Sequence, residues 1–504
     1  METRTAARLL GGALALGTLA EMLFFGTPLG VNLPIAVAAL LACAALARPA
    51  RRRLDRADLW LGPAALLFAA FAALRTDPAL LVFDVPAGIA LGGAATAAIG
   101  GVPVTRRSVT GLVVLGAWLV GLVASGVARP LATLGPAVRP RIGARLAVRA
   151  AAPVLRGLAI ALPLLALFAL LFAAADAVFA RYLGDLLSWS IDLGDLPARS
   201  AFALFAAWLA GGLLFAATRI GDEPLAAGEE AVARLLPRPR LGATEARVVL
   251  VALDLLFAAF VGLQAAYLFG GRDTLALTGL TYSAYARSGF FELTGVGFLA
   301  GGVILALETA VARRTRGHVA AAVALAGLTA IVLVSAALRL RLYQDAYGWT
   351  ELRFYALAAI AWLGVGIAVT IGALVAGRTR WLLHALAVAG LAVAVAVNLV
   401  GPRSFVTGQN VARALDPSLV PPDGETGLDA YYLAGLGDDA VPVLLDALPS
   451  LPEPEREVIG IALGARLAAL DADAASRSWP AWNLARERAR ELLSGARARL
   501  GAYR

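Results

Sequence analysis

The sequence predicts an all-α membrane protein, a polytopic bundle of helices followed by a small helical domain outside the bilayer. Apolar residues fill 60% of the 504 positions and the mean hydropathy is +0.78, whereas soluble domains are usually about 45 to 50% apolar. The apolar residues also form long uncharged blocks, and about 20 such residues cross a hydrocarbon core as a helix. Because backbone groups find no water there, every block that crosses must be helical.

Twelve apolar segments meet this description. They are residues 9–26, 31–47, 59–74, 79–104, 109–128, 157–180, 200–218, 248–269, 290–312, 319–338, 354–376 and 381–400. We expect about eleven of them to cross. The first segment contains Glu21 and lacks a clear small-residue cleavage site, so we interpret it as an uncleaved span and not as a signal peptide.

The number of crossings follows from the arginines of the connectors, since positively charged loops stay in the cytoplasm. If all twelve segments cross, arginine is shared almost equally between the two sides. If 109–128 does not cross, one side holds 25 connector arginines and the other holds 8. The sequence therefore predicts a cytoplasmic N-terminus, an odd number of crossings and an extracytoplasmic C-terminal domain. Either 79–104 or 109–128 is the segment that fails to cross.

Four regions are expected. They are N-terminal membrane segments (1–128), a basic cytoplasmic connector (129–156), the main transmembrane bundle (157–401) and a soluble helical domain (402–504). The connector is either a plain topology determinant or a basic surface on anionic lipid. In the last region we expect two short helices within 429–448, broken at Gly437 with Asp438 or Asp439 as N-cap. Further helices are predicted over 453–470 and 481–500.

The composition excludes several chemistries. All 44 basic residues are arginines, so there is no lysine for a Walker A motif or a Schiff base. Cys43 is the only cysteine, and His318 and His384 are the only histidines, which argues against a thiolate or histidine-rich metal centre. We therefore predict no cofactor and no metal. The expected partners are membrane lipids, with 402–504 as the candidate surface for a protein partner. No nucleic acid is expected, because the arginines lie in short membrane connectors.

Acidic and polar residues inside the apolar segments are candidate functional positions, since a charge at mid-bilayer costs about 2.5 to 3.5 kcal/mol on insertion scales. Four acids fall near the predicted outer ends of their spans, where they could reach the interface: Glu21, Asp84, Asp176 and Glu292. Asp254 is deeper, and with Gln264 on the same helix it could mark a polar seam. Glu308 precedes Arg313 and Arg314, which predicts an interfacial ion pair. Pairs such as Gly88 with Gly92, and Gly297 with Gly301, indicate close helix contacts.

Two outer connectors are rich in arginine and tyrosine, against the orientation rule. The candidate ligand-binding residues there are Tyr282, Tyr285, Arg287, Glu292, Arg339, Arg341, Asp345 and Arg353. Arginine binds carboxylate or phosphate bidentately, which favours a site for a small anion or a lipid headgroup. The alternative is an aromatic belt whose arginines neutralise the outer acids. No residue is predicted to be catalytic.

Four stretches carry a family resemblance. They are Thr281 to Leu293, Tyr343 to Arg353, Leu428 to Leu445 with its Asp-Asp-Ala-Val-Pro motif, and Trp482 to Arg486. Together they resemble the bacterial membrane family called domain of unknown function 4173, which is related to family 4153. The resemblance covers about residues 150–504. It implies a polytopic inner-membrane protein and supplies no activity.

Three functions compete at this point. The first is a transport protein or a binding protein for a small anion or lipid headgroup, built from the outer connectors. The second is a membrane-anchored sensor or assembly subunit acting through 402–504, which predicts a groove or apolar patch on that domain. The third, an intramembrane enzyme using acids such as Glu292, has the least support because no metal-ligand set accompanies it.

Overall fold

The computed structural model describes residues 3–48, 55–128, 131, 161, 165, 195–218, 223–235, 241–269, 290–311, 314–422 and 424–503. Within these ranges the regular elements are helices, apart from one isolated bridge between Leu241 and Val311. Nine of the described helices are long and apolar enough to cross a membrane, and three further apolar helices are shorter. The fold is the predicted all-α class, a multi-pass helical membrane protein.

The contacts divide the chain into two compact units. The first comprises residues 1–74, 81–232 and 477–483, and the second comprises residues 75–80, 233–476 and 484–504. Each is described by itself.

The helices of the first unit pack closely through small residues. They are α1 (Thr3–Phe24), α2 (Asn32–Ala47), α3 (Leu61–Leu74), α4 (Pro78–Ile99), α5 (Val109–Ser125), α9 (Leu196–Thr218) and α10 (Glu223–Leu235). A Cβ atom at Gly17 of α1 would lie 2.3 Å from the carbonyl oxygen of Ala203 in α9. A Cβ atom at Gly212 would lie equally close to the carbonyl oxygen of Leu122 in α5. Only glycine allows these backbones to approach so closely.

A short segment from near the C-terminus, residues 477–483, belongs to this first unit. The N–H of Val31, in the loop between α1 and α2, donates to the carbonyl of Trp482 at 2.9 Å. The Asn483 side chain donates to the carbonyl of Ala72 in the last turn of α3 at 3.0 Å. A Cβ at Gly30 would lie 2.4 Å from the Trp482 oxygen, so this approach needs glycine. The segment is thus fixed to three helix ends.

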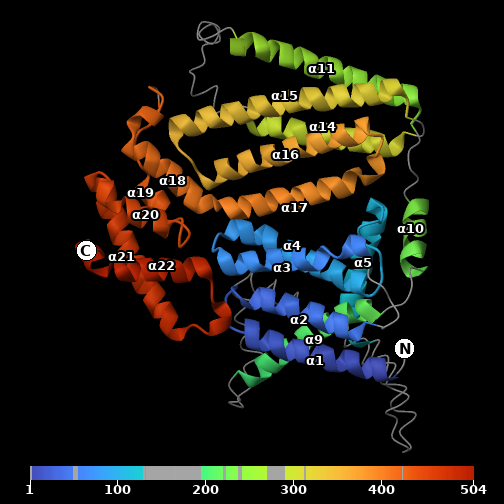
Figure 1. Ribbon diagram of the computed structural model, residues 1–504, viewed down its shortest axis with the longest axis horizontal. Coiled ribbons are helices and arrows are strands. Elements are labelled where there is room, and N and C mark those ends of the chain that lie inside the picture. The colour runs from blue at the N-terminus through green and yellow to red at the C-terminus, as the bar shows by residue number, and fades with distance from the viewer. Residues whose placement is uncertain are drawn as a thin grey trace, which may run out of the picture. The chain divides into compact units, whose positions relative to one another are not determined.

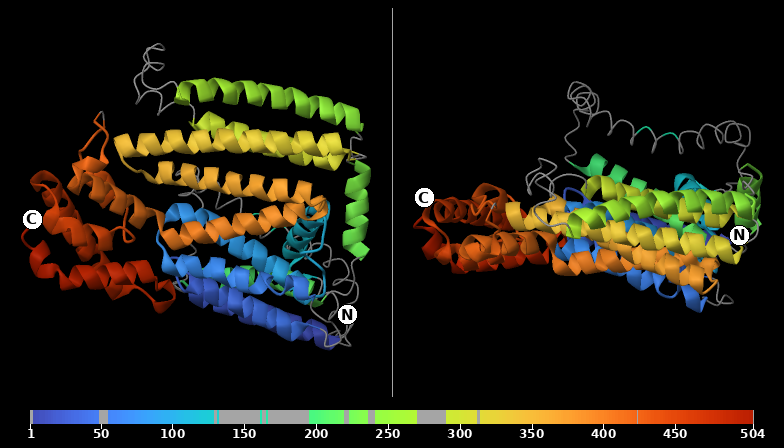
Figure 2. Two further views of the ribbon diagram at one scale, coloured as in Figure 1. Left: turned by 45° about the horizontal axis from the view of Figure 1, so that its top comes forward. Right: turned by 90° about the horizontal axis from the view of Figure 1, so that it is seen from above.

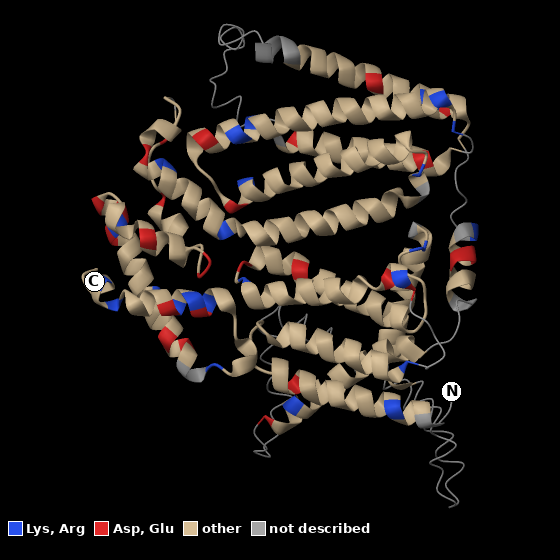
Figure 3. Ribbon diagram, viewed as in Figure 1, with Lys and Arg blue, Asp and Glu red and all other residues tan. Residues whose placement is uncertain are grey.

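In the second unit five long apolar helices lie side by side. They are α11 (Ala243–Phe269), α14 (Phe290–Ala310), α15 (Arg316–Tyr347), α16 (Glu351–Val375) and α17 (Leu382–Val400), shown from green to orange in Figures 1 and 2. The aliphatic core shared by α11, α14, α15 and α16 is centred on α15, whose buried residues include Leu325, Leu333 and Leu340. Figure 3 shows their charges gathered mainly toward the helix ends. This distribution is the one that a bilayer requires.

The chain then turns into a group of shorter helices, which we call the head (residues 402–476 and 484–503). They are α18 (Pro402–Leu415), α19 (Ala430–Ala434), α20 (Val441–Ala447), α21 (Glu453–Ser476), α22 (Leu484–Gly495) and α23 (Arg497–Leu500). Gly401, at a φ of +69°, ends α17, and Pro402 starts α18. The head has its own apolar core, and Trp349 and Phe354 from the α15–α16 turn are part of that core.

The described helices cover eleven of the twelve predicted apolar segments, and 157–180 lies almost entirely outside the described residues. The number of crossings and the four region boundaries stay predictions. The helix break at Gly437 is confirmed, at a φ of +76°. The predicted N-cap is wrong: Ala440 caps α20 without a side-chain hydrogen bond. The carboxylates of Asp438 and Asp439 instead pair with arginines, so their oxygens are engaged away from the start of α20.

Candidate functional site

The polar site that the structure assembles best lies where α15, α16 and α18 meet, and we call it the joint. The turn between α15 and α16 is fixed by its own residues. Gly348 ends α15 at a φ of +78°, and the Thr350 side chain caps α16 by accepting from the N–H of Arg353 at 3.3 Å. A Cβ at position 348 would lie 2.5 Å from the Arg413 guanidinium, so both backbone conformation and space require glycine.

Arg353, one of the predicted ligand-binding residues, is directed at the protein's own backbone. Its guanidinium donates to the carbonyls of Tyr347 at 3.0 Å and Gly348 at 2.6 Å, and stacks 4.1 Å above the ring of Tyr343. These carbonyls end α15 and have no partner within the helix. Arg353 therefore supplies the hydrogen-bond donors that these carbonyls at the end of α15 lack.

Arg413 of α18, in the head, also donates to backbone carbonyls at the end of α15. Its buried guanidinium donates to the carbonyls of Asp345 at 2.9 Å, Ala346 at 3.1 Å and Glu425 at 3.1 Å. Burial lowers the pKa of Arg413, and Asp345 acts in the opposite direction. Asn410, one turn earlier, pairs with both the N–H and the carbonyl of Trp349, each at 2.8 Å. The end of α15 and the α15–α16 turn are thus held by α18 through four hydrogen bonds, and the fifth ties Arg413 to the head loop at Glu425.

A charged cluster centred on Arg403 forms the second part of the joint. Its Nε lies 2.8 Å from the Glu351 carboxylate and 3.7 Å from the carboxylate of Asp77, which is 1% exposed. The Tyr355 hydroxyl donates to the same Asp77 at 2.9 Å. The Tyr432 hydroxyl accepts from the N–H of Glu351 at 2.8 Å. Burial raises the pKa of Tyr432, and this hydrogen bond opposes the shift.

Asp439 ties the residues that follow α3 to the head. Its carboxylate accepts from the N–H and the hydroxyl of Thr76 at 2.9 and 2.8 Å, and lies 3.5 Å from Arg75. Arg75 also donates to the carbonyl of Asn398, in the last turn of α17, at 3.0 Å. The Ser404 hydroxyl donates to the Asp439 carbonyl. Residues far apart in sequence are therefore joined by hydrogen bonds that are largely removed from solvent.

The other predicted ligand residues are not brought together. Glu292 is exposed in the first turn of α14, and Arg339 is half-buried in α15. Arg341 is 50% exposed, lies 5.3 Å from the ring of Trp349, and is 4.0 Å from Asp345. The remaining three predicted residues lie outside the described residues: Tyr282, Tyr285 and Arg287.

The predicted intramembrane residues are also separate. Glu21 of α1 forms an ion pair with Arg199 of α9, and Asp84 is buried in α4. Asp254 is half-buried and Gln264 buried on α11, with no described hydrogen bond between them. Asp176 lies outside the described residues.

The predicted ion pair of Glu308 is confirmed, at 2.7 Å from Arg314. The second oxygen of Glu308 lies 2.7 Å from Nε2 of His318, which is fully buried at the start of α15. Within the described residues, no group of three or more histidine, cysteine or acidic side chains is arranged to hold a metal ion.

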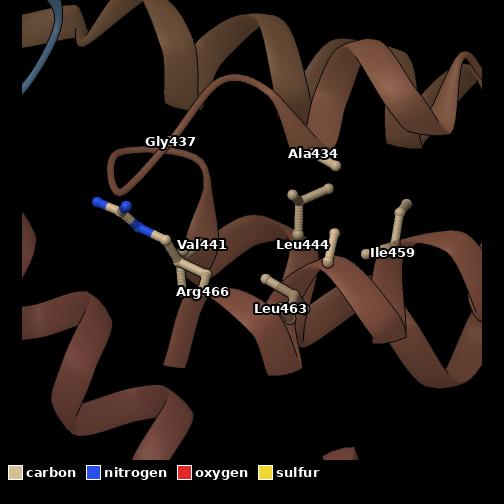
Figure 4. Close-up of a pocket in the computed structure, with 8 residues that line it drawn as sticks. Ala434, Gly437, Val441, Leu444, Ile459, Leu463 and Arg466 are labelled. Carbon is tan, nitrogen blue, oxygen red and sulfur yellow. The ribbon is translucent and has the colours of Figure 1, made fainter. Parts of the chain in front are cut away.

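The head carries a small apolar hollow (Figure 4). It is lined by Ala434, Gly437, Val441, Leu444, Ile459, Ala462, Leu463 and Arg466. Its volume of about 20 Å³ holds little more than one water molecule. Arg466, at the rim, is 39% exposed and pairs with buried Asp438 at 2.6 Å. Ordinary small-molecule sites have about 300 to 1,000 Å³, so this hollow is too small for such a ligand.

Sequence reasoning missed the joint residues Arg403, Asn410 and Arg413. A signal existed, because each lies three, four or seven positions from Val406, which is fully buried in α18. Residues at these spacings share one helix face. Polar residues on the apolar face of an amphipathic helix indicate buried hydrogen bonds. The pairing of Arg403 with Asp77 could not be inferred from spacing, because more than 320 residues separate the two.

The fold and the joint define a class, a multi-pass helical membrane protein whose C-terminal helices are built onto the ends of its spans. The chain belongs to the family described as Domain of unknown function (DUF4153), whose model matches residues 61–447. The resemblance predicted from the sequence named the related family 4173 first, and that part stays a prediction. No curated protein and no solved structure matches the chain.

Proposed function

We propose that the chain is a membrane-anchored assembly or sensor subunit that acts through its head. The observation that carries this proposal is the joint itself. The head is not tethered by a loop, since it shares an apolar core with Trp349 and Phe354 and is bound to span ends through Arg403, Arg413 and Asp439. A head held this way presents its surface in a fixed orientation, and a force or partner acting on it reaches α15, α16 and α17 directly.

Small-anion transport has less support from the described residues. Of the predicted ligand arginines, Arg353 is engaged by backbone carbonyls. Arg341 differs from Arg353, because half of its side chain is exposed beside Trp349. This favours a second candidate function, binding of an anionic lipid headgroup at Arg341. Native mass spectrometry should then show fewer bound anionic lipids in Arg341→Gln and an unchanged number in Arg488→Gln, an exposed arginine of the head.

We also propose that the head lies on the membrane face opposite the N-terminus, which in a bacterial inner membrane is the outer face. Two separate contacts support this. Residues 477–483 bind the loop that follows α1, and Asp439 binds Thr76, which follows α3. One crossing precedes the first of these loops and three precede the second. Neither argument depends on whether 79–104 or 109–128 crosses.

Site-specific photo-cross-linking in intact cells tests the proposed partner. A photoreactive residue at Arg466, on the rim of the hollow, should yield a discrete cross-linked protein, whereas one at Arg499, an exposed residue of α23, should not. If neither Arg466 nor the exposed Tyr431 and Ile461 yields a product in correctly inserted protein, the head is not a partner surface and the proposal fails.

A further inference from the structure

Two tryptophans stand exposed on the short segment that joins α21 to α22. Trp479 is 66% exposed and Trp482 is 43% exposed, while Pro480 and Ala481 between them are buried. The segment is therefore held by its backbone and small residues, and its two largest side chains face outward. Tryptophan is highly buried on average in soluble proteins, so two exposed indoles so close in sequence need a reason.

The position of the segment supplies that reason. It is hydrogen-bonded to the α1–α2 loop through Val31 and to the last turn of α3 through Asn483. The α1 helix ends at Phe24, α2 starts at Asn32 and α3 ends at Leu74. Three apolar helices end here on one face, and Ala72 is only about 3 Å inside the end of α3. The tryptophans therefore lie at the level where these helices leave the hydrocarbon core.

The segment also lies against α1. Met22, in the last turn of α1, is 63% exposed, and α1 is long and apolar enough to cross a membrane. Indole rings are favoured at the boundary between acyl chains and headgroups, because the ring is largely apolar and its N–H can bind water or lipid oxygens.

We propose that Trp479 and Trp482 form a lipid anchor that inserts into the headgroup–acyl boundary on the face where α1 ends. The occupant of this surface is the bilayer itself. The anchor fixes the link between α21 and α22 at the membrane surface, independently of the joint and of any protein partner. It thus goes beyond the proposed function, and either proposal can fail without the other.

Spin-label accessibility measures this insertion directly. Cys43 is the only cysteine, so a Cys43→Ala background allows single labels at Trp479→Cys, Trp482→Cys and, as the matched control, Tyr431→Cys, which is 79% exposed on the head. In reconstituted bilayers, labels at 479 and 482 should be reached more readily by lipid-soluble oxygen than by a water-soluble nickel chelate. The label at 431 should show the opposite order.

A second measurement leaves the cysteine unchanged. Lipids brominated near the headgroup end of the acyl chain should quench a smaller fraction of the emission after Trp479→Phe and Trp482→Phe are combined, although seven of the nine tryptophans remain. Labels at 479 and 482 that prefer the nickel chelate, or that neither reagent reaches because protein covers them, would overturn the proposal. So would quenching that the double substitution leaves unchanged.

Discussion

At the scale of single residues, Gly348 is the position on which the joint depends most. It combines a positive φ with a space already filled by Arg413 and Asn410. Gly348→Ala should lower the free energy of unfolding by about 1 to 3 kcal/mol or more, because the strain of a left-handed backbone conformation and the steric clash of the new Cβ both destabilise the fold. Chemical unfolding in detergent measures the change. Gly327→Ala is the matched control, because nothing lies within 4 Å of a Cβ there, and it should be neutral or stabilising.

Tyr432 gives the joint a pH dependence. Burial raises its pKa, so the neutral phenol is favoured in the folded protein. The stability that follows is fully present below the ordinary tyrosine pKa of about 10 and is lost as pH rises through the higher folded value. The melting temperature should fall less steeply above pH 10 in Tyr432→Phe than in the wild type. Equal slopes for the two proteins would contradict this account of Tyr432.

Single residues also show how far the sequence alone could go. The ion pair of Glu308 with Arg314 was predictable because six positions separate the residues across one short turn. Asp438 and Asp439 were expected to cap a helix, since local hydrogen bonds are the only ones that spacing reveals. Their real partners, Arg466 and Thr76, lie 28 and 363 positions away. Contacts over such distances depend on packing that no local pattern encodes.

At the scale of elements, Arg403 connects α18 to α16 and to the residues after α3. Arg403→Met would leave Glu351 and the almost fully buried Asp77 without their cation. Breaking a buried ion pair from one side typically costs about 3 to 5 kcal/mol, so we expect a loss of that size in unfolding experiments. Arg499→Met, on the exposed face of α23, should change stability by less than about 0.5 kcal/mol. Equal small effects of both substitutions would show that the cluster does not stabilise the joint.

The elements themselves were largely predictable, because membrane crossing imposes length and hydropathy together. Segments such as 354–376 correspond closely to α16 (Glu351–Val375). Close helix contacts were less predictable. Gly88 does approach Ala69, and Gly297 approaches Leu333 of α15, whereas a Cβ at Gly301 would meet nothing within 4 Å. Still tighter contacts, such as those at Gly17 and Gly212, carry no distinguishing local pattern, since small residues occur throughout these helices.

At the scale of the whole molecule, the side of the membrane that we propose for the C-terminus rests on the contacts of residues 477–483 and of Asp439. A reporter enzyme active only outside the cytoplasm should be active when fused after Arg504 and silent when fused at Arg145. The arginine count of the connectors predicts the same result on independent grounds. Activity at both fusion sites, or at neither, would require an even number of crossings between them, and the outer-face assignment of the head would be wrong.

The central claim is that the head is rigidly joined to the spans of the second unit. The most direct test is the distance distribution between spin labels at Val365→Cys, exposed on α16, and Glu457→Cys, exposed on α21, in a Cys43→Ala background. Pulsed electron paramagnetic resonance should give a single narrow distance distribution in the wild type and in Arg499→Met, and a clearly broader one in Arg403→Met. A broad distribution in the otherwise unaltered protein, as a flexible tether would produce, would contradict the claim.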